Sequence, residues 1–424
     1  MLEISYIREN KEVVIEKLNK RFFANPEQII SEIIDLDEKR RSSQAELDQV
    51  LSEMKTISKK IGLLMKEGKK DEAEQVKKKT AELKAKSSTL GDTLKNSESQ
   101  LRSQLLQVPN LPQDIVPIGK TEEDNIVVEE NNFDITLPAS KAPHWDLIKK
   151  YDIIDFELGN KITGAGFPVY KGKGARLQRA LINFFLDEAS EAGYSETQVP
   201  ILINKDSGYG TGQLPDKDGQ MYHITEEDYF LIPTGEVPIT NIYRDVILTK
   251  KDLPIKNCGF TPCFRREAGS WGADVRGLNR LHQFDKVEIV QVRLPEESEQ
   301  TLIEMRDYIV SLLKKLNLPY RILNLATGDL GFTASITYDL EVYSAAQERW
   351  LEVSSVSNFQ TYQANRLKLR YKDENKKSHL LHTLNGSALA LPRIVAAILE
   401  NNQTEDGIII PEVLRPYTGF DKID

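Results

Sequence analysis

The chain has 424 residues, 40% of them apolar, and a formal net charge of -9. One hydrophobic core rarely serves so long a chain, so two domains are expected. The acidic balance argues against a surface coated throughout with nucleic-acid-binding charge, although it allows a local basic patch. The only cysteines are Cys258 and Cys263, whose C-x4-C spacing lacks a second ligand pair. Reduced thiols in a cytoplasmic protein are therefore expected, with no disulfide framework and no zinc.

The beginning of the chain mixes acidic and basic residues and has no apolar stretch, so no signal peptide is predicted. Residues 1–24 predict one short helix, around EVVIEKLNKR, packed on the main body. The longest apolar run, residues 388–399, contains Arg393 and is too short to cross a bilayer, so no membrane contact is expected.

Residues 25–106 are rich in Lys, Glu, Gln, Ser and Leu, and apolar residues recur there at spacings of three and four. The first run has Leu47, Val50, Met54, Ile57, Ile61 and Leu64, and the second has Val76, Leu83, Leu90, Leu94 and Leu101. This pattern predicts helices over about 27–66 and 70–106, joined at Gly68 in an antiparallel coiled-coil hairpin about 55 Å long. Polar residues weaken the predicted seam and indicate a compliant arm: Arg40, Ser43, Thr80, Ser87 and Ser97. The arm is assigned to an N-terminal domain of residues 1–108.

Five lysines gather near the predicted tip: Lys69, Lys70, Lys77, Lys78 and Lys79. A lysine run is often no more than a solvated helix face. The functional alternative is contact with a phosphate backbone, which is independent of nucleotide sequence and sensitive to salt. The sequence leaves both readings open.

Pro109 and Pro112 end the second helix, and residues 109–130 are predicted to be a linker to a domain of residues 131–424. In that domain β runs such as 287–292 and 335–343 alternate with amphipathic helices such as 174–192 and 300–316. The absence of a regular βαβ repeat and of GxGxxG argues against a doubly wound nucleotide fold. A largely antiparallel sheet with flanking helices fits better, which gives an α+β protein.

The segment FRREAGSWGADVRGLNRLHQFDKVE, residues 264–288, predicts an antiparallel hairpin with charged side chains along its inner edges. Arg265 follows the first strand, residues 260–264, and Glu267 comes at the same-face spacing of two, while Arg276 and Glu288 come from the far side of the loop. Guanidinium groups in this arrangement suit a phosphate or carboxylate ligand, because each can bind two oxygens and stays charged. An ordinary solvated surface hairpin is the alternative for a shorter match.

This hairpin resembles motif 2 of the class II aminoacyl-tRNA synthetases, in the form found in seryl-tRNA synthetases. Other segments resemble the same family: the helix ARLQRALINFFLDEASEAGYSETQVP resembles motif 1, GTGQLP with LIPTGE resembles the amino-acid pocket, and TLNGSALALPR resembles motif 3. TYDLEV and EVSSVSNF resemble the family segments TYDLEVW and EISSCSNF. The resemblance covers nearly the whole chain. It implies an N-terminal helical arm plus a class II antiparallel catalytic sheet, and a homodimer that contacts through motif 1.

The resemblance implies an ATP-dependent serine–tRNA ligase. Such an enzyme joins L-serine to ATP, giving seryl-adenylate, and then transfers serine to the terminal adenosine of tRNA(Ser); whether tRNA(Sec) is also charged stays open. Arg265 would bridge the serine carboxylate and the α-phosphate, and Arg393 would hold the γ-phosphate. Glu352 and Ser355 would bind Mg2+ through oxygen.

The remaining roles are carried over in the same way. The serine pocket would consist of Thr234, Glu236, Arg265, Glu288, Asn385 and Ser387. The ATP site would consist of Arg265, Arg266, Glu267, Leu281, His282, Gln283, Phe284, Glu352, Val353, Ser354, Ser355 and Arg393, with Phe284 stacked on adenine and Glu267 facing its amino group. Taken singly, Glu236 or Glu288 is more often a surface carboxylate, and His282 is more often structural than a base. Trp271, Ala388 and Pro392 depart from the family pattern and leave the pocket shape open.

Three other readings remain. One is a synthetase-like binding protein without catalysis, and another is a structural coiled-coil protein. The third is a class II synthetase for threonine, proline or histidine.

Overall fold

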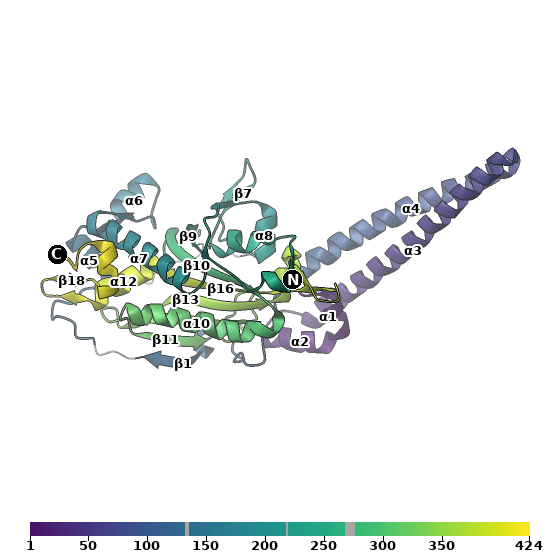
Figure 1. Ribbon diagram of the computed structural model, residues 1–424. Coiled ribbons are helices and arrows are strands. Elements are labelled where there is room, and N and C mark those ends of the chain that lie inside the picture. The colour runs from purple at the N-terminus through teal and green to yellow at the C-terminus, as the bar shows by residue number, and fades with distance from the viewer. Residues whose placement is uncertain (132–134, 218, 268–275) are drawn as a thin grey trace. The chain divides into compact units, whose positions relative to one another are not determined.

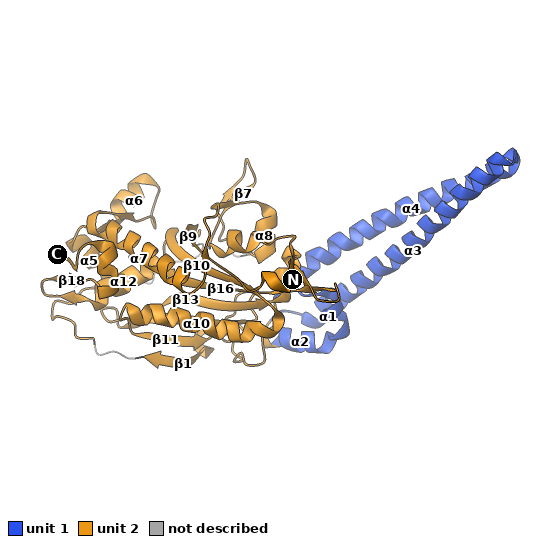
Figure 2. Ribbon diagram, viewed as in Figure 1, with its two compact units in different colours: residues 1–19, 23–109 blue, residues 20–22, 110–424 orange. Residues whose placement is uncertain are grey.

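The structure is a computed structural model that describes residues 1–131, 135–217, 219–267 and 276–424. The chain divides into two compact units (Figure 2), one of residues 1–19 and 23–109 and the other of residues 20–22 and 110–424. Trp271, one of the departures from the family pattern, lies outside the described residues. Among the described helices, none combines the length and apolar character that crossing a membrane requires.

The first unit is built from four helices: α1 Ile4–Glu9, α2 Lys11–Lys20, α3 Pro26–Lys66 and α4 Lys70–Leu105. The helix predicted around EVVIEKLNKR is present as α2; the prediction of one helix over residues 1–24 missed the separate helix α1, which ends at Asn10. The two long helices, of 41 and 36 residues, pack along each other as a hairpin (Figure 1). At 1.5 Å per residue, α3 is about 60 Å long.

Helices α3 and α4 bury apolar side chains along their whole length and polar ones at a few positions. Val50, Ile57 and Leu83 are buried there. Nearer the base, Asp37 is 1% exposed, and its two oxygens accept hydrogen bonds from Arg8 at 2.6 Å and Arg40 at 2.7 Å. Arg40 was expected only to weaken the seam; it also neutralises a buried carboxylate, which a pattern of apolar spacings does not reveal.

The second unit is organised around an eight-stranded sheet in the order β1-β11-β12-β13-β16-β10-β9-β4. Its strands are β1 Ile126–Asn131, β4 Ser195–Glu196, β9 Ile255–Phe264, β10 Gln283–Arg293, β11 Tyr320–Asn324, β12 Ile336–Ser344, β13 Arg349–Gln360 and β16 His382–Ala390. Neighbours are antiparallel, except that β4 runs parallel to β9. The antiparallel fold with a helical arm that the sequence predicted is confirmed. The stretch expected as a linker also supplies the edge strand β1, which pairs with β11.

Helices cover the sheet, and smaller sheets border it (Figure 1). The helices are α5 His144–Lys150, α6 Phe156–Ile162, α7 Gly172–Glu191, α8 Lys205–Thr211, α9 Glu236–Asn241, α10 Ser298–Lys315, α11 Thr361–Leu367, α12 Leu391–Asn401 and α13 Arg415–Thr418. The short strands are β2 Ile154–Asp155, β3 Val169–Tyr170, β5 Leu202–Ile203, β6 His223–Ile224, β7 Tyr229–Leu231, β8 Ile247–Thr249, β14 Arg370–Lys372, β15 Ser378–Leu380, β17 Gln403–Thr404, β18 Gly407–Ile409 and β19 Lys422–Ile423. Residues of α7, α10 and α12 share one hydrophobic core with the central strands. This hydrophobic core therefore fixes the strands that carry the polar site.

Candidate active site

A polar cluster lies where β10 and β16 adjoin the segment before α9. The carboxylate of Glu288 on β10 is fully buried and accepts hydrogen bonds from the Thr234 hydroxyl at 2.8 Å and the Asn385 amide at 3.1 Å. Lys286, two residues earlier on the same strand face, forms an ion pair with Glu288 at 2.7 Å and donates to the Thr234 hydroxyl at 3.0 Å. The cluster therefore presents hydrogen-bond donors and acceptors in fixed positions close to one another.

Glu236, at the start of α9, lies next to this cluster and is 6% exposed. Gln363 donates a hydrogen bond of 2.6 Å to its carboxylate, and the Thr383 hydroxyl holds Gln363 in turn at 2.7 Å. Burial, followed by the negative charge of Glu288, raises the pKa of Glu236 to about 7. A cation entering this space would stabilise the ionised form.

Two arginines belong to the same site. The Arg265 guanidinium stacks over Phe284, 5.3 Å from the ring centroid, and its Nε donates to the carbonyl of Pro233 at 3.4 Å. Arg393 donates from Nη1 to the carbonyl of Glu352 at 2.6 Å and from Nε to the carbonyl of Asn279 at 3.1 Å. Pro233 precedes Thr234, so Arg265 connects the polar cluster with the aromatic face of Phe284.

Three oxygen-bearing side chains meet beside Arg393. Ser355 lies opposite Asp339 in the β12–β13 pairing and donates to Glu352 at 3.4 Å. Desolvation would raise the pKa of Glu352, but Arg393 and Arg265 outweigh it and lower that pKa; the side chain is 49% exposed, so solvent moderates both effects. Burial and then the charge of Glu352 raise the pKa of Asp339 well above its usual value, and its Oδ1 is buried without a partner.

The other expected ATP-site residues lie around this centre in unequal roles. Leu281, Val353, Ser354 and Ser387 are buried, and the Ser354 hydroxyl bonds the Ser387 carbonyl at 2.6 Å. His282 stacks on Phe167 and meets the Tyr222 hydroxyl at 3.0 Å, while Arg266 and Gln283 are exposed. The Glu267 carboxylate pairs with Arg280 at 3.1 Å, so any contact with a base must compete with that ion pair. Arg276, the other arginine of the hairpin, lies over the ring of Trp145 at 5.0 Å.

Some residues of the site escaped sequence reasoning. Lys286 had a signal, since it stands two residues before Glu288 on a predicted strand. Asp339 stood inside the quoted TYDLEV segment without a role. Gln363 had no signal, because only the folded sheet brings α11 next to Glu236.

The lysines of the arm lie in the first unit and are exposed. Lys69 pairs with Glu67 at 2.9 Å, Lys77 with Glu74 at 3.6 Å and Lys79 with Glu53 at 2.6 Å. Exposed ion pairs of this kind contribute little stability, so they leave the lysines able to exchange partners.

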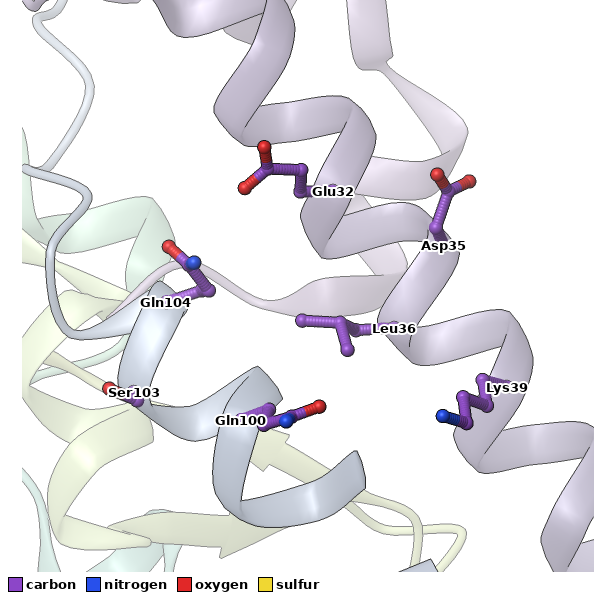
Figure 3. Close-up of a pocket in the computed structure, with 7 residues that line it drawn as sticks. All are labelled: Glu32, Asp35, Leu36, Lys39, Gln100, Ser103 and Gln104. Atoms are coloured by element: carbon purple, nitrogen blue, oxygen red, sulfur yellow. The ribbon is translucent and has the colours of Figure 1, made fainter. Parts of the chain in front are cut away.

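A hollow of about 480 Å³ opens between α3 and α4 near the base of the arm (Figure 3). It is lined by Glu32, Asp35, Leu36, Lys39, Gln100, Ser103 and Gln104. Two of these side chains are acidic and one is basic, and none is an aromatic ring or a guanidinium. The hollow therefore offers little to a nucleotide compared with the arginine-flanked site on the sheet.

The antiparallel sheet with arginines on the β9–β10 hairpin and at the start of α12 defines a class II aminoacyl-tRNA synthetase. Residues 222–402 match the family model of the tRNA synthetase class II core domain (G, H, P, S and T). Residues 1–112 match the seryl-tRNA synthetase N-terminal domain. The chain belongs to the seryl-tRNA synthetase family and is an ATP-dependent ligase.

Curated relatives and solved structures agree along the full length. The chain is 50% identical over 425 residues to the serine–tRNA ligase of Salinibacter ruber, covering 100% of this chain and 99% of the relative. It is 46% identical over 423 residues to that of Gloeothece citriformis, covering 98% of each. The seryl-tRNA synthetase of Pyrococcus horikoshii complexed with ATP has a TM-score of 0.91 at 33% identity, covering 100% and 99% of the two chains. The rival readings as a non-catalytic binding protein, a structural coiled-coil protein or a synthetase for another amino acid are not favoured.

Proposed function

We propose that Arg265, Glu352 and Arg393, beside the Thr234–Glu288 cluster, form the seat in which L-serine and ATP become seryl-adenylate. The proposal depends most on one observation: Arg393 on α12 pairs with Glu352 on β13 at 3.5 Å, and Arg265, directly after β9, also acts on that carboxylate and lowers its pKa. A serine carboxylate oxygen attacks the α-phosphorus, the bond to the β-phosphate oxygen breaks, and pyrophosphate leaves. Charge neutralisation and alignment accelerate such a step without a side-chain nucleophile.

The pocket cluster suits serine as the amino acid. Glu236 faces the place of its ammonium group, and Thr234, Glu288, Asn385 and Ser387 offer polar partners for the ammonium and hydroxyl groups. Alanine would leave these buried groups unpaired, which penalises it far more than the loss of one methylene from an apolar slot. Phe284 offers a face for adenine, with Leu281, His282 and Gln283 along the same edge.

Glu352 and Ser355 fit a bound Mg2+, because both present oxygen and the neighbouring Asp339 oxygen has no partner. Among the described residues no three His, Cys, Asp or Glu side chains converge as a metal cage. That geometry suits an ion completed by phosphate and water oxygens. When bound, Mg2+ would neutralise phosphate charge and orient the leaving pyrophosphate.

The RNA partner of the proposal is tRNA(Ser), whose terminal adenosine receives the serine. The lysines of the arm, Lys69 to Lys79, would contact its backbone by charge and shape. Aminoacylation of tRNA(Ser) and tRNA(Sec) transcripts side by side tests whether the second RNA is also a substrate.

The proposal also includes a homodimer in the cytoplasm. The free, buried thiols Cys258 and Cys263 suit a reducing compartment. The motif 1 segment is the interface that the resemblance implies, and the edge strand β1 offers further apolar surface, with Ile126, Val127 and Val128 exposed by 44–52%. Light scattering of the purified chain measures its oligomeric state, and a monomer at micromolar concentration would contradict the dimer.

The assignment of Arg265 is tested by Arg265→Ala in serine-dependent ATP–pyrophosphate exchange. Loss of a guanidinium that stabilises the transferring phosphoryl group is expected to lower kcat by about 100-fold or more. Arg370→Ala, which removes an exposed arginine on β14, serves as the control and should leave exchange unchanged. Near-normal exchange by Arg265→Ala would contradict the proposed role.

A further inference from the structure

A buried acid–histidine pair lies outside the residues assigned above. Glu400 on α12 and His144, the first residue of α5, are both fully buried, with His144 Nδ1 2.6 Å from Glu400 Oε1. The Glu400 carboxylate also accepts hydrogen bonds from the His144 backbone N–H at 2.8 Å, from Gln347 at 2.9 Å and from the Ser344 hydroxyl. Four donors around one carboxyl group fix it as a carboxylate that only accepts.

The other nitrogen of the ring determines the tautomer. The backbone N–H of Leu278 donates to His144 Nε2 at 2.8 Å. Nε2 is therefore unprotonated, and the ring proton lies on Nδ1, facing Glu400. Gly277 permits this approach: its φ is +67°, and a Cβ there would lie 2.2 Å from Nε2. The pair thus fixes the backbone where the hairpin returns towards β10.

From that backbone the contacts lead to the active site. Asn279 follows Leu278, and its carbonyl accepts the Arg393 Nε–H at 3.1 Å. Its side-chain amide donates to Gln347 at 3.3 Å, and Gln347 bonds Glu400 as well. The carbonyl that orients Arg393 is therefore held at two points by groups anchored on Glu400.

We infer that His144, oriented by Glu400, is a positioning residue for Arg393 and thus for the terminal phosphates of ATP. The inference rests on the proposed role of Arg393. It predicts that losing the Leu278 bond weakens the binding of ATP selectively, because AMP lacks the phosphates that Arg393 would hold.

Two substitutions at one position separate this role from general stability. In His144→Gln the amide carbonyl can take the place of Nε2 and accept from Leu278, while the bond to Glu400 is lost. In His144→Asn the shorter amide can replace Nδ1 and donate to Glu400, but it leaves Leu278 without its acceptor. Titration calorimetry of the full chain with ATP and with AMP gives the ratio of the two affinities.

His144→Asn is expected to lower the affinity for ATP about five- to tenfold while AMP binding stays within twofold, and His144→Gln should keep the wild-type ratio. If His144→Asn does not fold, Gly277→Ala tests the same link: its Cβ would lie 2.2 Å from Nε2 and separate the ring from the Leu278 N–H, so the same selective loss is expected. Equal changes for ATP and AMP, or none, in the variant that folds would overturn the inference.

Arg393→Ala in the same titration keeps the two proposals apart. If it leaves the ATP-to-AMP ratio unchanged, the role of Arg393 itself is wrong. If it lowers the ratio while neither His144→Asn nor Gly277→Ala does so, only the positioning role of His144 fails.

Discussion

Replacing Glu236 by glutamine should stabilise the protein at alkaline pH while damaging serine recognition. The Glu236 carboxylate is buried, and its pKa is raised from 4.5 to about 7, first by desolvation and then by Glu288. An acid with a raised pKa binds more protons in the folded state than in the unfolded one. Stability is therefore lost as the pH rises from 4.5 to 7 and stays constant above that range.

The magnitude follows from the two pKa values. Their difference corresponds to about 3 kcal/mol at pH above 7, of which about 1.4 kcal/mol develops between pH 6 and pH 8.5. Glutamine does not titrate, and its carbonyl can still accept the Gln363 hydrogen bond seen in the structure. The stability advantage of Glu236→Gln should accordingly grow by about 1–1.5 kcal/mol across that interval.

Urea unfolding of both proteins, at one protein concentration and without substrates, measures this advantage at pH 6 and pH 8.5. In ATP–pyrophosphate exchange at pH 8.5 the variant should raise the KM for serine by about 10- to 100-fold, as expected for loss of a charge-assisted hydrogen bond, and leave the KM for ATP nearly unchanged. The reasoning about burial would be refuted if Glu236→Gln were less stable than the wild type at pH 8.5. It would also be refuted if the difference in free energy of unfolding between the two proteins were the same at both pH values. An unchanged KM for serine would refute the place of Glu236 in the pocket.

Two further predictions concern the first unit. Deleting residues 26–104 should spare serine-dependent ATP–pyrophosphate exchange and abolish aminoacylation of tRNA, because the chemistry is assigned to the sheet; equal loss of both activities would contradict this division. Asp37→Asn should destabilise the unit by about 1–3 kcal/mol in urea unfolding followed by helical circular dichroism, because Arg8 and Arg40 lose the carboxylate that they share. Arg8→Gln should cost less, since its side chain is 35% exposed, and a larger effect of Arg8→Gln than of Asp37→Asn would count against this account.

Periodicity made much of the fold predictable from the sequence. The spacing of Val50, Ile57 and Leu83 specified the arm, whose helices end within a residue or so of the expected positions. The β run predicted over residues 287–292 lies within the central strand β10, Gln283–Arg293. Sequence patterns failed where an interaction joins distant segments, as for Asp37 with Arg8.

The site likewise contains residues that the sequence predicts and residues that it does not. Arg265, Glu288 and Glu352 stand in motifs that could be read directly, and the structure brings them to one face of the sheet. Gln363 and His144 could not be read, because their partners lie 127 and 256 residues away. Tertiary packing determines which residues so far apart in the sequence form a buried polar contact, so a local pattern of residue types cannot predict it.

The β10 strand also implies where the chain can tolerate a change of length. Phe284, Lys286 and Glu288 occupy alternate positions and face the site, whereas Val287 and Ile289 face the hydrophobic core. Because β9 and β16 pair with both edges of this strand, neither neighbour lets it slide. One residue inserted or deleted within the paired part of this strand would turn the site-facing side chains on one side of the change towards the hydrophobic core. Homologues should therefore vary in length outside this strand.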